Sequence, residues 1–146
     1  GIFFYRIKDI YIPPELRTKI FVSKNLYDSF LYYKPYLIPI ELKSGKSKSF
    51  SFDEKIIKKH QEEALLDAIN FPGVIAGFVF NFRDLNETYF VHILDYKDFK
   101  NKTDRKSISL DYCRNVGIEI KSKIAKTRRR YLIKDFVEEL SRCNWG

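Results

Sequence analysis

Residues 74–82 are almost continuously apolar, which is typical of a strand that is buried on both faces of a sheet. The surrounding pattern predicts further strands at residues 3–6, 19–22, 25–33, 36–43, 88–94, 118–121 and 129–132. Helices are predicted over residues 53–69, 109–115 and 133–142. Ser51 and Glu54 fit a capping box before the first helix, and Gly117 fits the end of the second. We therefore predict an α/β fold with a mixed central β-sheet flanked by helices.

The length of 146 residues is that of one ordinary domain. We expect residues 1–146 to form a single domain, with the basic segment 121–146 packing on it or extending it. No apolar run reaches the ~18 residues of a membrane-spanning helix, and the first residues lack the features of a signal peptide. Cys113 and Cys143 support neither a zinc site nor a disulfide framework, so a reducing, cytosolic setting is the simplest interpretation. Because the sequence contains no Met, we expect a processed, tagged or truncated N-terminus.

The net charge of +8 is unevenly distributed along the chain. Two basic blocks, residues 31–60 and 101–146, flank an acidic middle. Localised positive charge is typical of a protein that binds a polyanion, either a nucleic acid or a membrane surface. A soluble basic protein with solvated lysines is the alternative interpretation.

Residues 25–33 and 36–43 form a predicted hairpin whose turn is centred between positions 34 and 35. Paired positions in a symmetric hairpin then sum to 69, so Asp28 is expected directly across from Glu41. Strand periodicity places Glu41 and Lys43 on one face and the apolar residues 38, 40 and 42 on the other. Three charged groups are therefore predicted to converge.

Two features of this hairpin depart from a simple pattern. Pro39 lies inside the second strand, although proline cannot donate to a ladder, so it implies an edge position, a bulge or a nitrogen that faces away. Lys34 and Pro35 are poor residues for a tight two-residue turn. A longer loop or a bulge would shift the register by one residue.

Two carboxylates that face each other across a hairpin repel and destabilise it, unless a cation lies between them. A few oxygen ligands with room for water suit Mg²⁺, with Mn²⁺ as a substitute. The backbone carbonyl of Leu42 points near the same place and is a third candidate ligand. Lys43 would then position the attacking water or neutralise charge on a phosphate. The alternative is that Asp28 and Glu41 are surface charges and that Lys43 forms a salt bridge with one of them.

Further motifs accompany Asp28 and Ile40-Glu41-Leu42-Lys43, namely a loop with Lys46, Lys48, Ser49, Ser51 and Phe52 and the pair His60-Gln61. This set resembles the PD-(D/E)xK nuclease superfamily and, within it, the Holliday-junction resolvases of the RecU type and their phage relatives. Residues 74–79 and 89–93 are similar to the strands that continue the family's pattern. The resemblance covers roughly residues 5–100 and implies a restriction-endonuclease-like fold.

This resemblance implies that Asp28 and Glu41 are metal ligands, that Lys43 is the catalytic lysine and that Gln61 is a supporting residue of the site. It also implies a homodimer whose two sites nick a four-way DNA junction symmetrically. We expect no membrane partner and a location in the cytoplasm of a bacterial cell or a phage-infected host. An ordinary polar helix face is the alternative for the pair His60-Gln61.

The sequence departs from the family at the N-terminal side of the site. Tyr27 rather than proline precedes Asp28, which the superfamily tolerates. The resolvases usually begin with a helix whose acidic residue completes the site, and nothing before Gly1 supplies it, so we expect either a truncation or a substitute helix elsewhere. Residues 11–24 are the segment available for the family's stalk. His92 lies in a predicted strand and is expected to be structural.

Two groups of cations are predicted to hold DNA phosphates. The first comprises Lys46, Lys48, Lys55, Lys58 and Lys59, and the second comprises Lys126, Arg128, Arg129 and Arg130. Further candidates are Arg6, Lys8, Arg17 and Lys19. For the second group, a solvated charged hairpin or a contact with a partner protein is the alternative. Tyr32, Tyr33 and Tyr36 are candidates either for stacking at the opened centre of a junction or for core packing.

The predicted function is a Mg²⁺-dependent crossover junction endodeoxyribonuclease that resolves four-way junctions by paired nicks. A catalytically weak or silent branched-DNA-binding module of the same fold is one alternative. A related nicking or flap nuclease is another. Branched and linear DNAs incubated with Mg²⁺ would separate these three functions.

Overall fold

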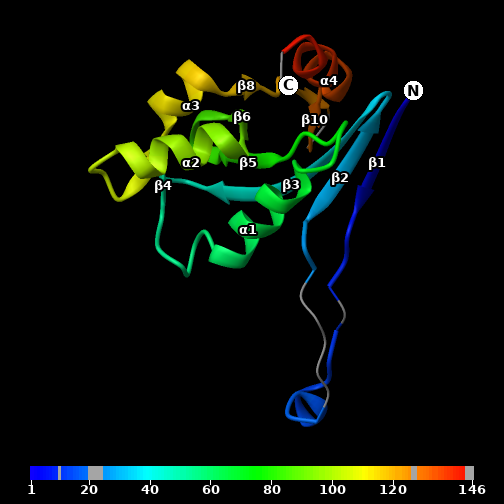
Figure 1. Cartoon of the computed structure of the whole chain (residues 1–146), viewed down its shortest axis with the longest axis vertical. Coiled ribbons are helices and arrows are strands. Elements are labelled where there is room, and N and C mark those ends of the chain that lie inside the picture. Colours follow the sequence, from blue (N-terminus) through cyan, green and yellow to red (C-terminus); the bar gives the residue numbers. More distant parts are fainter. Residues whose placement is uncertain (10, 20–24, 126–127, 144–146) are drawn as a thin grey trace.

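The centre of the fold is a six-stranded sheet, at one edge of which β1 and β2 run side by side (Figure 1). The computed structural model describes residues 1–9, 11–19, 25–125 and 128–143, with the side chains of 124–130 excepted. The strands, in spatial order, are β1 (Ile2–Arg6), β2 (Ser29–Tyr33), β3 (Tyr36–Gly45), β5 (Gly77–Phe82), β6 (Glu87–His92) and β8 (Ile118–Glu119). β3 and β5 run parallel, and the other neighbouring pairs are antiparallel. The predicted mixed central sheet is confirmed.

Two short antiparallel ladders and four α-helices complete the described part of the chain. β4 (Ser49–Ser51) pairs with β7 (Ser107–Ser109), and β9 (Ser122–Ala125) pairs with β10 (Arg128–Tyr131). The helices are α1 (Lys59–Ala68), α2 (Ile93–Lys102), α3 (Leu110–Val116) and α4 (Ile133–Arg142). Two 3-10 helices, η1 (Pro14–Leu16) and η2 (Arg83–Leu85), lie in connections. The last helix has the bounds that the sequence predicts.

The helices cover both faces of the sheet and create two hydrophobic cores. Residues of α1, α2 and α3 pack on one face around Phe78, Phe80 and Tyr96. Residues of α4 pack on the other face, where Phe136 meets Val79. Because side chains alternate along a strand, β5 contributes to both cores. Its burial on both faces is the predicted outcome for the apolar run.

The hairpin of β2 and β3 has the predicted register, since Ser29 pairs with Ile40 and Tyr33 with Tyr36. Paired positions therefore sum to 69. A turn at Lys34 and Pro35 joins the two strands, in spite of the poor fit of these residues to a tight turn. The register matters because it fixes which residues of β2 lie beside each residue of β3.

Pro39 is accommodated within the sheet by a gap in the ladder between β3 and β5. Leu37 forms an isolated bridge with Val74, and the continuous ladder to β5 begins only at Ile40. Leu37 exchanges its backbone hydrogen bonds on the β5 side. Residues two apart in a strand face the same neighbour, so the nitrogen of Pro39 faces away from β2. An edge position, one of the three predicted explanations, is wrong because β3 has neighbours on both sides.

The first helix begins at Lys59, later than the predicted residue 53. Ser51 Oγ accepts a hydrogen bond from the N–H of Asp53, and the Asp53 carboxylate accepts one from the N–H of Lys55. These contacts stabilise a local turn, so Ser51 and Glu54 do not form the predicted capping box. Glu54 instead accepts a hydrogen bond from the N–H of Lys59, at the first residue of α1.

The sequence pattern does not predict α2, and it extends the preceding strand to residue 94. β6 ends at His92, whose Nδ1 accepts a hydrogen bond from the N–H of Leu94 and so caps α2. Burial lowers the pKa of His92 to about 4, which keeps the ring a neutral acceptor. His92 thus has the structural role that we expected.

The connection between β1 and β2 carries η1 far from the sheet (Figure 1). Of the strand predicted at residues 19–22, Lys19 lies in a turn and the rest falls outside the described residues. The late strands are observed as β8 and β10, accompanied by β9. Within the described ranges, no helix combines the length and the apolar character needed to cross a membrane.

Candidate functional site

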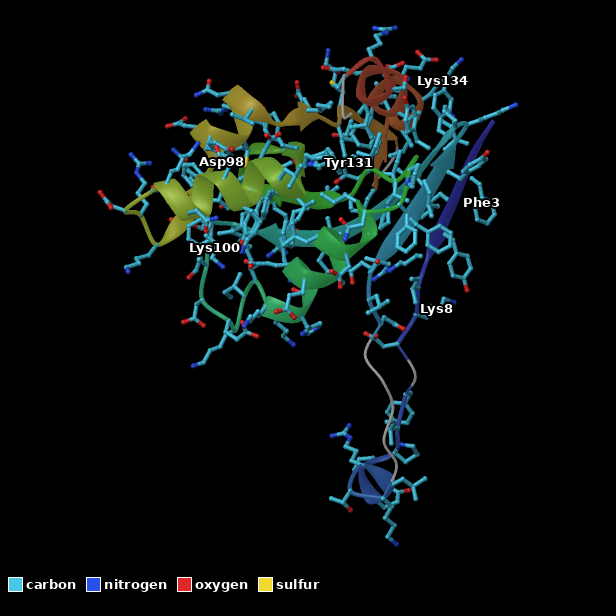
Figure 2. The ribbon with its side chains drawn as sticks, in the orientation of Figure 1. Phe3, Lys8, Asp98, Lys100, Tyr131 and Lys134 are labelled. Carbon is cyan, nitrogen blue, oxygen red and sulfur yellow. The ribbon has the colours of Figure 1, made fainter. Side chains whose placement is uncertain are left out.

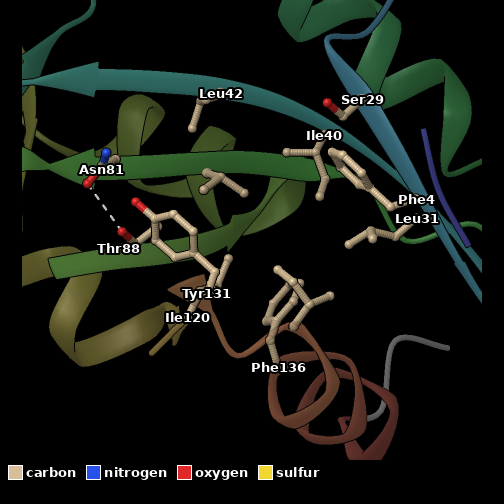
Figure 3. Close-up of a pocket in the computed structure, with 12 residues that line it drawn as sticks. Phe4, Ser29, Leu31, Ile40, Leu42, Asn81, Thr88, Ile120, Tyr131 and Phe136 are labelled. Atoms are coloured by element: carbon tan, nitrogen blue, oxygen red, sulfur yellow. Dashed lines mark hydrogen bonds between the residues drawn. The ribbon is translucent and has the colours of Figure 1, made fainter. Parts of the chain in front are cut away.

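β3 presents Glu41 and Lys43 on the face of the sheet that α1 covers. Glu41 is 4% exposed, and the side chain of Lys43 is 14% exposed. Leu42 points to the opposite face, where it lines an apolar pocket with Ile40 and Phe136 (Figure 3). The predicted division of β3 into a charged and an apolar face is therefore observed.

Gln61, in the first turn of α1, connects the two charged residues of β3. Its Nε2 donates a hydrogen bond to Glu41 Oε1 over 2.6 Å, and its Oε1 accepts one from Lys43 Nζ over 2.8 Å. The same oxygen accepts from the backbone N–H of Lys58 at 3.2 Å. Lys43 Nζ lies 3.8 Å from Glu41 Oε1. The amide therefore holds the carboxylate and the ammonium in a fixed relation.

Asp28 lies where the ladder between β2 and β3 ends. Its N–H donates to the carbonyl of Ile40 over 3.1 Å, so Asp28 is not the ladder partner of Glu41 that the hairpin arithmetic predicts. Its carboxylate Oδ2 accepts a hydrogen bond from the N–H of Leu42 at 2.9 Å. Since the N–H and C=O of one strand residue face the same neighbour, the Leu42 carbonyl also points to the Asp28 side. Asp28 and Glu41 still line one cavity.

The pKa values of Glu41 and Lys43 are both shifted toward the neutral forms. Burial and, after it, the negative charge of Asp28 raise the pKa of Glu41 to about 8. Burial lowers the pKa of Lys43, an effect that Glu41 and Asp28 oppose and that Lys58 increases. The ammonium of Lys43 thus does not offset the combined effect of burial and of the Asp28 carboxylate on the pKa of Glu41. A divalent cation near both carboxylates would stabilise their ionised forms.

A cavity of about 240 Å³ opens beside these groups, room for several water molecules at ~30 Å³ each. Its lining consists of Asp9, Asn25, Asp28, Glu41, Lys58, His60 and Gln61. Asn25 Nδ2 donates to Asp9 Oδ1 over 2.9 Å. Sequence reasoning missed Asp9 and Asn25. The pairing of β1 with β2 brings the segments that carry them to the site, and no local pattern in the sequence marks either residue.

The oxygen donors at the site fit a hard divalent cation. No group of three or more His, Cys, Asp or Glu side chains converges within the described ranges. Asp28, Glu41 and the Leu42 carbonyl nevertheless form a small oxygen set, with space beside it for water. Mg²⁺ accepts such a set because it keeps several of its own waters. These three groups are the candidate ligands that the sequence predicts.

The predicted DNA-contacting lysines near the site are exposed, namely Lys46, Lys48, Lys55, Lys58 and Lys59. Lys58 also lines the cavity, and Lys59 forms an exposed pair with Glu63 at 3.7 Å. Arg128, Arg129 and Arg130 lie in β10, with side chains outside the described part. Lys126 lies wholly outside the described residues.

The other predicted contacts divide between the surface and a core. Arg6, Lys8, Arg17 and Lys19 are exposed. Tyr33 and Tyr36 pack against the core on the α4 face, so core packing applies to them. Tyr32 is 44% exposed and remains available for stacking.

Comparison with known proteins places the chain in a family. Residues 13–133 match the family model described as Recombination protein U, or RecU. The chain is 45% identical over 152 residues to the SPbeta prophage-derived uncharacterized protein YotM of Bacillus subtilis (strain 168), covering 95% of this chain and 77% of that protein. Its fold is similar to that of Archaeoglobus fulgidus Hjc, a Holliday junction resolvase from an archaeal hyperthermophile, with a TM-score of 0.53 at 14% identity over 82% of this chain and 83% of that chain. This likeness supports the restriction-endonuclease-like fold, and the family match shows that the chain belongs to the Recombination protein U family.

Proposed function

We propose that this chain is a metal-dependent endodeoxyribonuclease that resolves four-way DNA junctions by paired nicks. The observation that carries the proposal is the contact chain from Glu41 through Gln61 to Lys43, in which Glu41 and Gln61 line one cavity with Asp28. These residues lie within the part of the chain that matches the recombination family. Hjc, whose fold is similar, is a Holliday junction resolvase. Two carboxylates at one cavity, with the ammonium of Lys43 bonded to the lining residue Gln61, suit phosphodiester hydrolysis assisted by a metal ion.

The groups that would hold Mg²⁺, or Mn²⁺ in its place, are Asp28, Glu41 and the Leu42 carbonyl. When bound, the ion would polarise the scissile phosphate and favour ionisation of the attacking water. Besides the ion, the protein contributes positive charge to the site through Lys43. Its ammonium, held 2.8 Å from Gln61 Oε1, stabilises the negative charge that develops on the phosphate. Gln61 keeps the side chains of Lys43 and Glu41 in fixed positions during this step.

DNA binding in this proposal depends mainly on phosphate contacts. The exposed lysines around the site, above all Lys58 at the cavity, attract the backbone next to the scissile bond. The net charge of +8 acts in the same sense. Affinity should therefore fall steeply with salt and depend little on sequence.

A panel of four-way, flap, nicked and linear DNAs incubated with Mg²⁺ tests the proposal. We expect symmetric nicks in the four-way junction, with 5′-phosphate and 3′-hydroxyl ends, and no nicks in the presence of EDTA. Glu41→Gln should bind the junction and leave it uncut. Binding without cleavage at any Mg²⁺ or Mn²⁺ concentration would instead identify a DNA-binding module. Cleavage confined to flaps or nicked duplexes would identify a related nuclease.

Paired nicks require two active sites, and we propose that a homodimer supplies them. β1 is the outer strand of the sheet, and its residues Phe3, Phe4 and Tyr5 are 56%, 57% and 52% exposed. Figure 2 shows Phe3 on the outer side of this strand. Exposed aromatic side chains on an edge strand favour association with another chain. Sedimentation of the double variant Phe3→Ser, Tyr5→Ser should show a shift toward monomer, and a wild-type protein that stays monomeric at high concentration contradicts the dimer.

A further inference from the structure

We infer that Glu62 is a positioning residue of the site, which anchors α1 to α2 and thereby holds Gln61 against Glu41 and Lys43. The inference rests on the proposed function, because it assigns Glu62 a role in keeping that site assembled. Glu62 directly follows Gln61 in α1. The two neighbouring side chains bond in different directions, Gln61 to β3 and Glu62 to α2.

Glu62 is 3% exposed and accepts hydrogen bonds from three side chains of α2. Tyr96 Oη donates over 2.8 Å, Lys100 Nζ over 2.6 Å and Lys97 Nζ over 3.3 Å. Tyr96 is fully buried, and Lys100 also lies over its ring at 5.9 Å. Figure 2 shows Lys100 on the side of α2 that faces the lower part of the molecule. The carboxylate is thus held at both of its oxygens.

Because Gln61 and Glu62 are neighbours in one helix, the contacts of Glu62 also restrict the position of Gln61. Consecutive residues of an α-helix point ~100° apart, so contacts at Gln61 and Glu62 restrain α1 on two sides at once. The Gln61 hydrogen bonds of 2.6 Å and 2.8 Å are short, and such bonds weaken once the atoms separate beyond ~3.2 Å. A small rotation of α1 about its axis would therefore separate Gln61 from Glu41 or from Lys43.

The hydrogen bond and the ion pair that Lys59 forms at the start of α1 involve exposed groups. The N–H of Lys59 donates to Glu54, and Lys59 pairs with Glu63 at the surface. Exposed pairs of this kind exchange readily with water and restrain a helix weakly. A buried carboxylate, by contrast, is costly to leave without its donors. Together with the hydrogen bond from Tyr27 Oη to the Ala64 carbonyl at 3.2 Å, Glu62 therefore holds α1 in one orientation.

A double-mutant cycle separates this role from a general contribution to stability. Glu62→Gln keeps the shape of the side chain but removes its charge, and we expect it to slow junction cleavage about tenfold. In a Gln61→Ala background the same change should slow cleavage by less than about twofold, because Gln61 is the residue through which Glu62 acts. Equal slowing in both backgrounds would overturn the inference.

A matched control comes from Glu87, a second glutamate whose ion pair anchors a different helix, α3. Glu87 of β6 forms an ion pair at 2.6 Å with Arg114 of α3, at a distance in sequence from the site residues. Glu87→Gln should change the cleavage rate by the same factor with and without Gln61→Ala. A loss that depends on Gln61 in this control as well would mean that any weakened helix contact disturbs the site, which would also overturn the inference.

The side-chain amide of Gln61 gives a readout that needs neither metal nor cleavage. In nitrogen-15 spectra of the metal-free protein, its two amide protons should differ strongly in shift, since Nε2 donates to Glu41. Tyr96→Phe removes one donor to Glu62 and should move both shifts toward those of free glutamine, as should Glu62→Gln. Tyr89→Phe, which removes a donor to Glu87, should leave them unchanged. Unchanged Gln61 shifts in both Glu62 and Tyr96 variants would refute the inference, even if the wild-type protein proved not to cut DNA.

Discussion

Glu41 and Glu62 are both buried, at 4% and 3% exposure, yet their surroundings are opposite. Burial raises the pKa of Glu62, but hydrogen bonds from Lys100 and Tyr96 outweigh burial and lower the pKa below its usual value. At Glu41 burial and the charge of Asp28 act in the same direction and raise the pKa to about 8. Equal burial thus produces opposite shifts.

The difference lies in the cations that each carboxylate already contacts. Two lysines of α2 lie within 3.3 Å of Glu62, whereas one lysine lies 3.8 Å from Glu41 and Asp28 adds a second negative charge. Glu62 therefore stabilises the fold without any ligand. The ionised form of Glu41 is disfavoured, and a further cation beside it would stabilise that form. Carboxylates of this second kind are characteristic of functional sites.

The largest expected effect concerns Lys43, the lysine that lies 3.8 Å from Glu41 and bonds to Gln61. Lys43→Ala should slow cleavage of a four-way junction by roughly a hundredfold to a thousandfold, because it removes charge stabilisation at the reacting phosphate. Single-turnover cleavage with saturating protein measures this loss. The exposed Lys102, which pairs with Asp98 at 2.7 Å on α2, is the control. If Lys102→Ala lost as much activity, Lys43 would have no special role.

The second effect concerns stability, and the free energy of unfolding should fall at only one of the two glutamates. Glu62→Gln leaves two lysines partly buried without their counter-charge and should lower the free energy of unfolding by about 3 kcal/mol. Glu41→Gln replaces a carboxyl whose ionised form is disfavoured by burial and by Asp28, and it should leave the free energy of unfolding unchanged or raise it. Urea unfolding in EDTA compares them. A loss at Glu41→Gln equal to that at Glu62→Gln would remove the distinction between the two carboxylates.

The third effect is the response to metal. A divalent ion that binds the folded protein at ten times its Kd raises the free energy of unfolding by about 1.4 kcal/mol. We therefore expect Mg²⁺ to raise the Tm of the wild-type protein above its value in NaCl of equal ionic strength. Glu41→Gln should abolish this increase. An increase that survives in Glu41→Gln would place the metal elsewhere.

The smallest effect concerns acid. The folded-state pKa of Glu62 lies below its usual 4.5, so the stability that Glu62 contributes is complete above pH 4.5 and is lost as pH falls through the folded-state value. The difference in free energy of unfolding between wild type and Glu62→Gln should therefore be constant near pH 6 to 7 and shrink below pH 4.5. Urea titrations at several pH values measure it. A difference that grows in acid would contradict the assignment of Glu62 as an ionised anchor.

Local periodicity was sufficient to predict β3 and its two faces. The alternation of Glu41 and Lys43 with apolar neighbours follows from strand geometry alone, and the register of β2 with β3 follows from the position of the turn. The limits of α4 agree with its apolar spacing. These features depend on residues that are close together in the sequence.

Features that depend on distant contacts were not predictable in this way. α1 starts at Lys59 because Ser51 and Asp53 satisfy a preceding turn and Glu54 bonds to Lys59. α2 has little apolar periodicity, and its place depends on the His92 cap and on Glu62, 34 residues before Tyr96. Asp9 reaches the cavity only because β1 returns to β2. No local pattern in the chain encodes these three contacts.

The hydrogen bond from Leu42 to Asp28 has a consequence for the choice of ion. Oδ2 of Asp28 already accepts the N–H of Leu42 at 2.9 Å, which makes Oδ1 the better placed atom for coordination. A carboxylate that offers one oxygen suits the compact octahedral shell of Mg²⁺, whereas Ca²⁺ favours more ligands, often including carboxylates that bind through both oxygens. In the proposed nuclease, this hydrogen bond at the end of one β-ladder would thus favour Mg²⁺ over Ca²⁺.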